Sequence, residues 1–472
     1  MADTGPMPLP FRRAPRCFRR HTLDWTVIGR YAGRRRGGIG GTTEPREEHT
    51  IMKQLIIRGG RPLQGELSVS GMKNSALPIL FATIVVQDIC TVENVPAVSD
   101  ITVTLRILES MGAGVTWNSG DSVTVDTRQM KQGTAPGALV RCLRGSNYLL
   151  GAELARYGRA RIGMTGGCSI GARPIDQHIK GFTALGAVVN DADDYVSAVA
   201  QNGLHGAKVV LDNISVGATA NILIAAATAS GTTVIENAAH EPHIVDLASF
   251  LNTCGADIVG AGTSIIKVRG VEQLHGCRYR IIPDMIEAGT YMLATAAAGG
   301  NVVLRHTIPR HLEALSAKLR EMGIAVTDDG ESTRISRAGI YGGANIQAVP
   351  YPGFPTDLQP QMTALLSLAQ GVSTVKDNVF QKRFRYVDEL QRMGAAINVD
   401  ESASQATIVG VNALHGADVM APDLRAGAAL VVAGLAADGI TRIADAEYIE
   451  RGYVDIAGKL CALGADVEMQ TV

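Results

Sequence analysis

The chain has 472 residues, a formal net charge of −1 and 46% hydrophobic residues. This composition excludes a disordered chain and gives no electrostatic reason to expect nucleic acid as a partner, while the length predicts two or three domains. The small net charge hides an asymmetry, because residues 1–51 hold ten Arg and five acidic residues and leave a charge of −6 for the rest. We expect residues 1–51 to be a basic, disordered extension, since they show no helical or strand period.

The body of the chain begins with a strand-like run at residue 52 and carries no sign of a membrane segment. No stretch of 18 apolar residues is free of charges and turn signals, so we expect no membrane partner. The seven cysteines are odd in number, spread out and without a CxxC pair, which favours the cytoplasm and argues against structural disulfides or a zinc knot. Five of them are expected to be buried free thiols: Cys90, Cys142, Cys254, Cys277 and Cys461.

One pattern recurs six times after residue 52: an apolar helix end, a glycine and the start of a strand. Examples are LESMGAGV, FTALGAVV and LCALGADV, and the six glycines are Gly112, Gly186, Gly255, Gly323, Gly394 and Gly464. Glycine adopts positive φ at little cost, so each copy predicts a helix that ends at the glycine and a strand that follows. Six copies at a period of about 70 residues indicate a repeat architecture.

Each repeat also contains a second helix that is apolar on all sides, which is typical of a buried helix. These helices are predicted at residues 74–86, 147–157, 219–230, 287–298, 357–370 and 425–437. A repeat of one buried helix, one outer helix and several strands predicts an α/β fold. We expect two lobes of three repeats, each a helix cluster wrapped by sheets.

The first residues of the buried helices are polar, and several are cations, as at Lys73, Arg144 and Arg425. A helix N-terminus presents unpaired N–H groups and favours anions. For any single helix the alternative is an ordinary cap. For the whole set, with several cations at the helix starts, an anion site is the better interpretation.

The segment IGMTGGCSIGARPIDQHI, residues 162–179, is the most distinctive in the chain. Cys168 lies among glycines in a polar loop, and Arg173 follows five residues later. A thiol in such a setting can act as a nucleophile or a proton donor. The alternative for Cys168 is one more buried free thiol.

The motifs SGMKNSALPIL, GGCSIGARPID, ISVGAT, PGFPTDLQPQ, PDLRAGAAL and IERGY resemble the enolpyruvyl transferase family, most closely its members that act on UDP-N-acetylglucosamine. The resemblance covers residues 52–472 and implies a two-lobed inside-out α/β barrel of six repeats. It implies that residues 73–280 form the lobe of the catalytic loop. Residues 52–72 and 281–472 would form the second lobe.

The resemblance also implies the reaction. The enolpyruvyl group of phosphoenolpyruvate moves to a hydroxyl of a uridine nucleotide and phosphate is released, with no metal and no organic cofactor. The expected acceptor is the 3-hydroxyl of UDP-N-acetylglucosamine, in peptidoglycan precursor synthesis. A monomer is expected, as for most of the family.

Residue by residue, the resemblance assigns Cys168 as the proton donor, Asp357 as the general base and Lys73 as an essential lysine. It assigns phosphoenolpyruvate binding to Lys73, Arg144, Arg173, Arg383, Arg425 and Arg451. It assigns nucleotide binding to Asn74, Arg173, Pro174, Ile175, Asp176, Gln177, Ser215, Val216, Gly217, Asp357 and Val379. Without the resemblance, Asp357 would be interpreted as a helix N-cap, and it could do both. A cysteine at the acid position implies sensitivity to fosfomycin.

Several positions depart from the family's pattern. Asn213 stands where a phosphate-contacting lysine is usual, Met285 where an arginine is usual and Tyr351 where a histidine is usual, while Thr165 replaces a loop proline. The changes gather around the acceptor and the lobe junction. They leave open an acceptor such as UMP, in nucleoside-antibiotic synthesis, and more remotely a non-catalytic nucleotide-binding paralogue.

Overall fold

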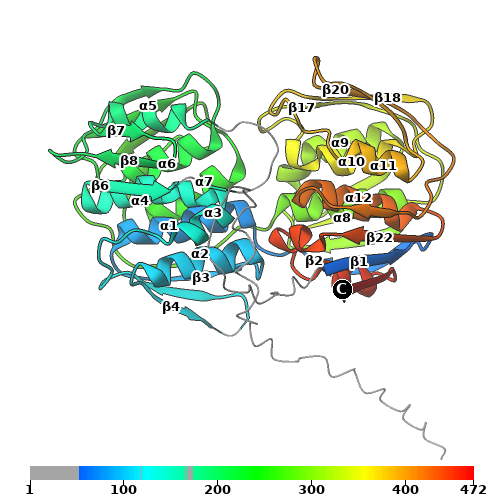
Figure 1. The fold of residues 1–472 in the computed structure, drawn as a ribbon, viewed down its shortest axis with the longest axis horizontal. Helices are drawn as coiled ribbons and strands as arrows, with labels where there is room; N and C mark the ends of the chain where they lie inside the picture. The colour runs from blue at the N-terminus through cyan, green and yellow to red at the C-terminus, as the bar shows by residue number, and fades with distance from the viewer. Residues whose placement is uncertain (1–52, 119, 164, 167–173) are drawn as a thin grey trace, which may run out of the picture. The chain divides into compact units, whose positions relative to one another are not determined.

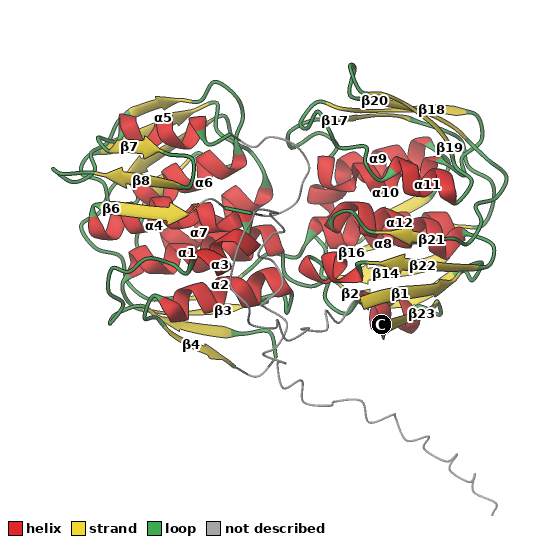
Figure 2. Ribbon diagram, in the orientation of Figure 1, coloured by secondary structure: helices red, strands yellow, loops and turns green. Residues whose placement is uncertain are grey.

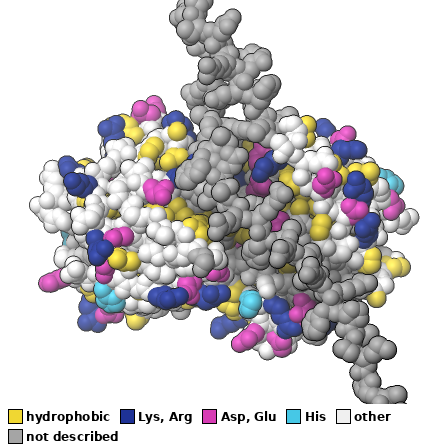
Figure 3. Space-filling model, turned by 90° about the horizontal axis from the view of Figure 1, so that it is seen from below, with side chains coloured by type: hydrophobic (Ala, Val, Ile, Leu, Met, Phe, Trp, Pro, Cys, Tyr) yellow, Lys and Arg dark blue, Asp and Glu magenta, His cyan; other side chains and the backbone are white. Residues whose placement is uncertain are grey.

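The computed structural model describes residues 53–118, 120–163, 165, 166 and 174–472 (Figure 1). The predicted extension, Cys168 and Arg173 lie outside these residues. Within the described part of the chain, no helix combines the length and the apolarity that crossing a membrane requires. Where Figure 3 shows described residues, charged side chains of both signs are interspersed.

Six inner helices form the core and confirm the predicted series. They are α1 (Lys73–Val86), α4 (Tyr148–Tyr157), α6 (Val216–Ala226), α8 (Met285–Ala298), α10 (Gln359–Leu366) and α12 (Leu424–Ala436). The first three pack on one another, as do the last three. Every residue of α12 from Leu424 to Leu435 is buried, as expected of a helix that is apolar on all sides. The predicted ends at residues 230 and 370 are too late, because the chain already turns ahead of Gly231 and Gly371, which have positive φ.

The outer helices alternate with the inner ones along the chain. They are α2 (Ser99–Ser110), α5 (Asp176–Ala184), α7 (Pro242–Thr253), α9 (Glu313–Glu321), α11 (Val387–Arg392) and α13 (Ile456–Ala462), with a short extra helix α3 (Gly137–Cys142). Each of the six outer helices ends at a predicted glycine, with φ between 88° and 97°. At Gly112 the N–H donates to the carbonyl of Glu109, and the next N–H donates to that of Leu108. The same pair of bonds recurs in all six copies and is the Schellman motif, which confirms the repeat.

The strands of the described residues form six open sheets around the helices (Figure 2). Three of these sheets are built from β3 to β13. In spatial order, the first contains β13 (Arg278–Arg280), β3 (Ile89–Glu93), β5 (Val123–Asp126) and β4 (Gly114–Trp117), and the second contains β6 (Arg159–Gly163), β8 (Tyr195–Val199) and β7 (Val188–Asp191). The third contains β11 (Asp257–Val259), β12 (Ile265–Arg269), β10 (Thr232–Glu236) and β9 (Lys208–Val210).

The other three sheets combine the first two strands with strands that follow residue 281. They are β21 (Asp418–Met420), β22 (Ile440–Ala444), β1 (Lys53–Arg58), β23 (Asp466–Thr471); β15 (Ala325–Asp328), β16 (Ser332–Arg337), β14 (Gly300–Arg305), β2 (Leu63–Ser68); and β17 (Asn345–Ala348), β18 (Val372–Asp377), β20 (Gln405–Val409), β19 (Ala396–Asp400). The chain is therefore α/β with helices inside and open sheets outside, and no sheet of the described residues closes into a barrel.

The sheets share one topology, which reflects the repeat. In each four-stranded sheet one edge pair is parallel and the other two pairs are antiparallel. The pairing of β1 with β22 and of β2 with β14 is what a chain that crosses between lobes requires. The residue boundaries of the two lobes stay a prediction.

Candidate active site

Two arginines converge on Asp357. This residue lies in a short 3-10 helix, Thr356–Leu358, directly before α10. Its Oδ1 accepts a hydrogen bond from Nη2 of Arg383 at 3.0 Å, and its Oδ2 accepts one from Nη2 of Arg425 at 2.8 Å. The guanidinium groups are buried, whereas 27% of the Asp357 side chain is exposed. Hydrogen bonds between two charged groups are strong, so both arginines are held at this carboxylate.

The charges around Asp357 keep it ionised. Burial alone would raise its pKa, but the charges of Arg425, Arg383 and Lys73 outweigh burial and hold the pKa well below its ordinary value. The interpretation of Asp357 as an N-cap is wrong. The N-cap position of α10 is occupied by Leu358, which makes no capping bond, and the Asp357 carboxylate instead accepts hydrogen bonds from two arginines.

A second buried carboxylate, Asp100, joins two further predicted cations. Its Oδ2 accepts from Nζ of Lys73 at 3.0 Å, and its Oδ1 accepts from Nε of Arg451 at 2.8 Å. Lys73 opens α1, whereas Arg451 closes the short 3-10 helix Ala446–Arg451, so Asp100 links the first repeat to the last. Burial raises the pKa of Asp100, and the charges of Lys73 and Arg451 more than reverse this, so the pKa is lowered.

Two further aspartates cap inner helices beside the cations Lys73 and Arg425. Asp284 caps α8 by accepting from the N–H groups of Ile286 and Glu287, and it also accepts from the N–H of Lys73 at 3.3 Å. Asp423 caps α12 in the same way and so fixes the turn that carries Arg425. These capping bonds connect the starts of inner helices to the two cation clusters.

Arg425 is also supported from its other side. Its Nη1 lies 3.4 Å from the hydroxyl of Tyr453, which is 2.8 Å from Oγ1 of Thr290 and accepts a bond from Gln361 at 3.2 Å. All four side chains are buried. A buried polar network of this kind holds a guanidinium in one orientation.

Arg144 lies beside the loop that leads to Cys168. It opens a 3-10 helix, Arg144–Asn147, ahead of α4, and its Nη1 donates to Oγ1 of Thr165 at 3.1 Å. Thr165 is one of the departures from the family pattern, and its hydroxyl supplies an acceptor that proline lacks. Cys168 and Arg173 lie outside the described residues, so their place in the site stays a prediction.

The predicted nucleotide-binding residues of α5 gather around Asp212. Nε2 of Gln177 donates to Asp176 at 2.8 Å and to Asp212 at 3.1 Å, and the side-chain oxygen of Gln177 accepts from the N–H of Asp212. Lys180, one turn further along, donates to Oδ1 of Asp212 at 2.6 Å. Asp212 therefore fixes the start of α5 to the turn that precedes α6.

The turn before α6 packs closely on α5. Ser215 caps α6 through its hydroxyl, and a side chain at Gly217 would lie about 3.1 Å from Nε2 of His178. Burial, helped by the charge of Arg144, lowers the pKa of His178 to about 4, so this ring is neutral. Val216 is half-buried, while Pro174 is exposed and Ile175 half-buried at the entrance to α5.

Two predicted nucleotide contacts lie elsewhere. Val379 is 39% exposed, and its N–H donates to Asp377, which also accepts from the hydroxyl of Thr356 beside Asp357. Through Asp377, which accepts both hydrogen bonds, Val379 lies near Asp357. Asn74 is half-buried in the first turn of α1, directly after Lys73.

The other departures occupy three different settings. Asn213 is exposed and follows Asp212, so the ammonium of Lys180 lies next to the position where the family's lysine is missing. Met285 is buried at the first residue of α8. Tyr351 is half-buried; its N–H donates to Glu241 at 3.4 Å, and its ring meets that of His311 edge-on.

Sequence reasoning missed the carboxylates that organise these cations, namely Asp100, Asp212 and Asp284. An aspartate at a helix start or in a turn is commonplace, and nothing local marks the cation that it meets. The buried-thiol prediction holds for Cys90, Cys142 and Cys254, but Cys277 is half-buried and Cys461 is exposed. Cys277 directly precedes the edge strand β13, and Cys461 lies in the last turn of the outer helix α13, so neighbouring elements cover both less completely.

Comparison with known proteins places the chain in a family. The family model of EPSP synthase (3-phosphoshikimate 1-carboxyvinyltransferase) matches residues 57–460. UDP-N-acetylglucosamine 1-carboxyvinyltransferase of Clostridium botulinum is 49% identical over 417 residues, which are 88% of this chain and 99% of the relative. UDP-N-acetylglucosamine 1-carboxyvinyltransferase 2 of Staphylococcus aureus is 48% identical over 418 residues, with 89% and 99% covered.

Solved structures agree with the fold. The enolpyruvyl transferase NikO from Streptomyces tendae is 27% identical with a TM-score of 0.80, over 89% of this chain and 100% of NikO. EPSP synthase from Acinetobacter baumannii is 19% identical with a TM-score of 0.68 over the same shares, a likeness that concerns the fold alone. Family match, curated relatives and fold together show that this chain is an enolpyruvyl transferase of the EPSP synthase family.

Proposed function

We propose that this enzyme transfers the enolpyruvyl group of phosphoenolpyruvate to the 3-hydroxyl of UDP-N-acetylglucosamine and releases phosphate, a step of peptidoglycan precursor synthesis. The observation that carries the proposal is the set of four buried cations held on Asp100 and Asp357. The relative from Clostridium botulinum, a UDP-N-acetylglucosamine 1-carboxyvinyltransferase that is 49% identical over nearly its full length, supports this choice of acceptor.

The cations suit a small substrate with several negative charges. Guanidinium groups hold carboxylate and phosphate through paired hydrogen bonds, and a lysine supplies a compact charge. Within the described residues, Nε and Nη1 of Arg383 have no hydrogen-bond partner although the side chain is only 2% exposed. Buried donors of this kind are costly unless an acceptor meets them, and an oxygen of phosphoenolpyruvate would be such an acceptor.

The proposed chemistry needs one proton donor and one proton acceptor. The acceptor hydroxyl adds to C2 of phosphoenolpyruvate as C3 gains a proton from Cys168, and Asp357 removes the hydroxyl proton. The resulting tetrahedral adduct then loses phosphate, while the thiolate of Cys168 takes a proton from C3 and restores the enol double bond. The proton held by Asp357 leaves with the phosphate, so both residues return to their starting states. Atoms and charges balance without a metal or a second cofactor.

The arginines at Asp357 make it a weak base until substrate arrives. Its pKa is held low by two guanidinium charges, and a general base works best with a pKa nearer to neutrality. Phosphoenolpyruvate that draws Arg383 and Arg425 onto its own oxygens would weaken both pairs. The pKa of Asp357 would then rise in the loaded site, where a base is needed.

Lys180 supports a nucleotide diphosphate as the acceptor. Its ammonium is fixed beside the turn that carries Ser215 and Gly217, next to the position where Asn213 lacks a charge. A cation near this turn suits a diphosphate. The UMP alternative rests on the same departure at residue 213, for which Lys180 supplies the missing cation.

Phosphate release from phosphoenolpyruvate, measured with UDP-N-acetylglucosamine and with UMP at matched concentrations, tests the acceptor. We expect turnover with the first and none with the second, and the reverse result would replace the acceptor.

Cys168→Ala should abolish turnover and sensitivity to fosfomycin. An unchanged Cys168→Ala variant would contradict the proposed proton donor. We propose further that the enzyme acts as a monomer, since one chain supplies all four buried cations. We also propose that it acts in the cytoplasm, as the spread of its seven cysteines without a CxxC pair favours.

A further inference from the structure

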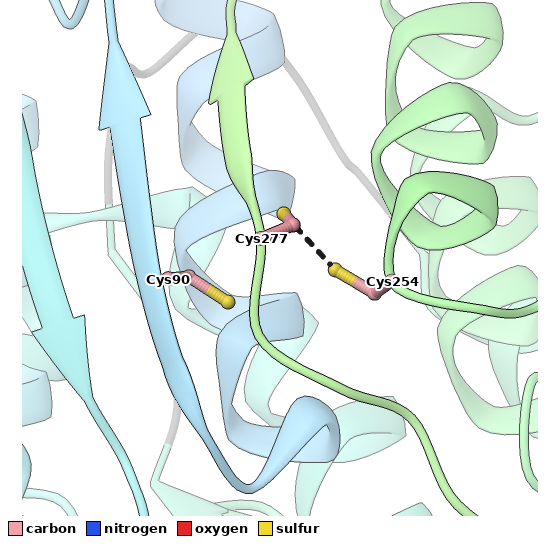
Figure 4. Close-up of side chains that lie close together, drawn as sticks. All are labelled: Cys90, Cys254 and Cys277. Carbon is pink, nitrogen blue, oxygen red and sulfur yellow. Dashed lines mark hydrogen bonds between the residues drawn. The ribbon is translucent and has the colours of Figure 1, made fainter.

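Three cysteines that are far apart in the sequence meet at one point of the first three repeats (Figure 4). Cys90 lies on β3, Cys254 follows the last residue of α7, and Cys277 directly precedes β13. Their Sγ atoms all lie within 4.8 Å of one another, and those of Cys254 and Cys277 are 3.2 Å apart. None of these three elements carries a residue that we assign to phosphoenolpyruvate or to the nucleotide.

The backbone holds the three sulfurs together. The N–H of Thr91, next to Cys90, donates to the carbonyl of Cys277 at 2.8 Å as β3 and β13 pair in parallel. The N–H of His275 donates to the carbonyl of Cys254 at 2.9 Å. Each cysteine is therefore tied to another through the main chain, so the cluster is preorganised by the fold.

The geometry matches that of a metal bound by thiolates. A tetrahedral zinc with Zn–S bonds of about 2.3 Å separates its sulfurs by about 3.8 Å. The Sγ atoms of Cys254 and Cys277, 3.2 Å apart, are somewhat closer than that, and no pair in the cluster exceeds 4.8 Å, so small side-chain rotations would fit the three sulfurs around one ion. Thiolate sulfur is a soft ligand that selects Cu⁺ and Zn²⁺ over Mg²⁺ or Ca²⁺.

We propose that Cys90, Cys254 and Cys277 bind one thiophilic cation of closed-shell d¹⁰ configuration, Zn²⁺ or Cu⁺. Three thiolates complete the coordination of Cu⁺, whereas Zn²⁺ takes a fourth ligand such as water. Cys90 and Cys254 are fully buried, and the half-buried Cys277 leaves one side of the cluster open for entry of the ion. The bound ion would fasten the end of α7 to the β3–β13 pair.

Binding displaces the thiol protons, so affinity should rise with pH. The sequence does not reveal this arrangement, because the three cysteines lack the short CxxC spacing of familiar zinc sites.

The test uses the fully reduced full-length enzyme carrying Cys168→Ser, which removes the thiol of the glycine-rich loop from the count. Cd²⁺, a spectroscopic stand-in for Zn²⁺, should give sulfur-to-metal charge-transfer absorption that saturates at one equivalent. Zn²⁺ and, under anaerobic conditions, Cu⁺ are titrated in competition with a chelator. The ion that the protein binds with the higher affinity is identified as the one that the cluster selects. Failure of both to bind at one equivalent would overturn the proposal.

Cys277→Ser is the decisive variant, since its side chain is half-buried and the change is small. It should weaken binding roughly 100-fold or more, because even a change beside a metal ligand costs 10- to 100-fold. Cys461→Ser, which alters an exposed thiol outside the cluster, is the matched control and should bind as the parent does. Equal affinity of the two variants would contradict the proposal.

Thermal unfolding gives a second readout that does not depend on activity. A cation that binds only the folded state raises the Tm, so saturating Zn²⁺ or Cu⁺ should raise it for the parent and for Cys461→Ser but not for Cys277→Ser. Oxidation of Cys254 and Cys277 to a disulfide by an added two-electron thiol oxidant such as diamide should abolish binding, and reduction with an added dithiol should restore it. If instead the oxidised protein binds the cation as well as the reduced protein does, the cluster is not the site.

Discussion

Asp357 and Asp100 are two carboxylates that each hold two buried cations, yet their surroundings differ. The side chain of Asp357 is 27% exposed, whereas that of Asp100 is 7% exposed. A substrate can reach the partly exposed carboxylate of Asp357 and take over its arginines. It cannot reach the enclosed carboxylate of Asp100, which therefore serves to position Lys73 and Arg451. The difference separates a group that reacts from a group that holds others in place.

The largest expected effect is that of Asp357→Asn. The amide cannot accept the hydroxyl proton, and loss of general acid–base catalysis typically costs 10²- to 10⁴-fold. We expect kcat to fall by about 10³-fold, and the Tm should fall as well, because the buried guanidinium groups of Arg383 and Arg425 lose a charged partner. The measurement is phosphate release together with thermal unfolding, and a variant with near-normal kcat would remove Asp357 from the role of base.

Asp100→Asn should act on stability without removing a proton-transfer group. Removing one partner of a buried ion pair typically costs 3–5 kcal/mol, because a charge stays buried without compensation. Here two cations lose their carboxylate, so we expect a loss of about that size in the free energy of unfolding, measured with denaturant. Asp466→Asn, whose partners Arg58 and Arg61 are largely exposed, is the control and should change stability little. Equal stability of the two variants would show that Asp100 is not the enclosed anchor that its contacts indicate.

The dependence of stability on pH sharpens the comparison in two separate windows. The lowered pKa of Asp100 means that its stabilisation is present above the ordinary carboxyl value of about 4 and is lost as pH falls through the folded pKa. Asp100→Asn should therefore flatten the stability profile below about pH 4. His178 has a pKa of about 4 in the fold against 6.5 unfolded, so its contribution is lost between those values as pH falls. His178→Gln should flatten that window alone, as chemical denaturation at stepped pH would reveal.

Lys180→Met should have the smallest effect. The ammonium is part of an exposed pair with Asp212, so stability should hold. We expect KM for the uridine nucleotide to rise a few-fold while kcat is unchanged, because uniform binding is lost and the chemistry is not touched. Lys208→Met, which alters another exposed pair, should leave KM as it is. Identical KM values for the two variants would remove Lys180 from the nucleotide site.

The repeat was predictable because its signal is local. A helix that ends in a Schellman turn needs glycine at one position, and Gly112 and its five equivalents provide it. The ends of α6 and α10 were predicted too late, since apolar residues continue into the turns that follow. Apolarity marks burial there and does not mark the helix.

The site was predictable only in part, because its contacts are remote in sequence. Asp100 meets Arg451 across 351 residues, and no periodicity or spacing joins them. The cations themselves came from family motifs, which do not show that carboxylates hold them. The cysteine cluster was not predictable for the same reason, because the pairing of β3 with β13 brings Cys90 to partners that are remote in the sequence.

The pairing of β1 with β22 and β23 also sets an order of events on the ribosome. Strands β3 to β13 have all their partners once residue 280 has been made. Strand β1 does not, because Arg58 pairs with Asp466, 408 residues later. At a synthesis rate of about 5–20 residues per second, β1 waits roughly 20–80 seconds as an unpaired strand whose Leu-Ile-Ile centre is not yet covered. During this interval the nascent chain offers an open edge to other chains, which makes β1 the segment that a chaperone has most reason to cover.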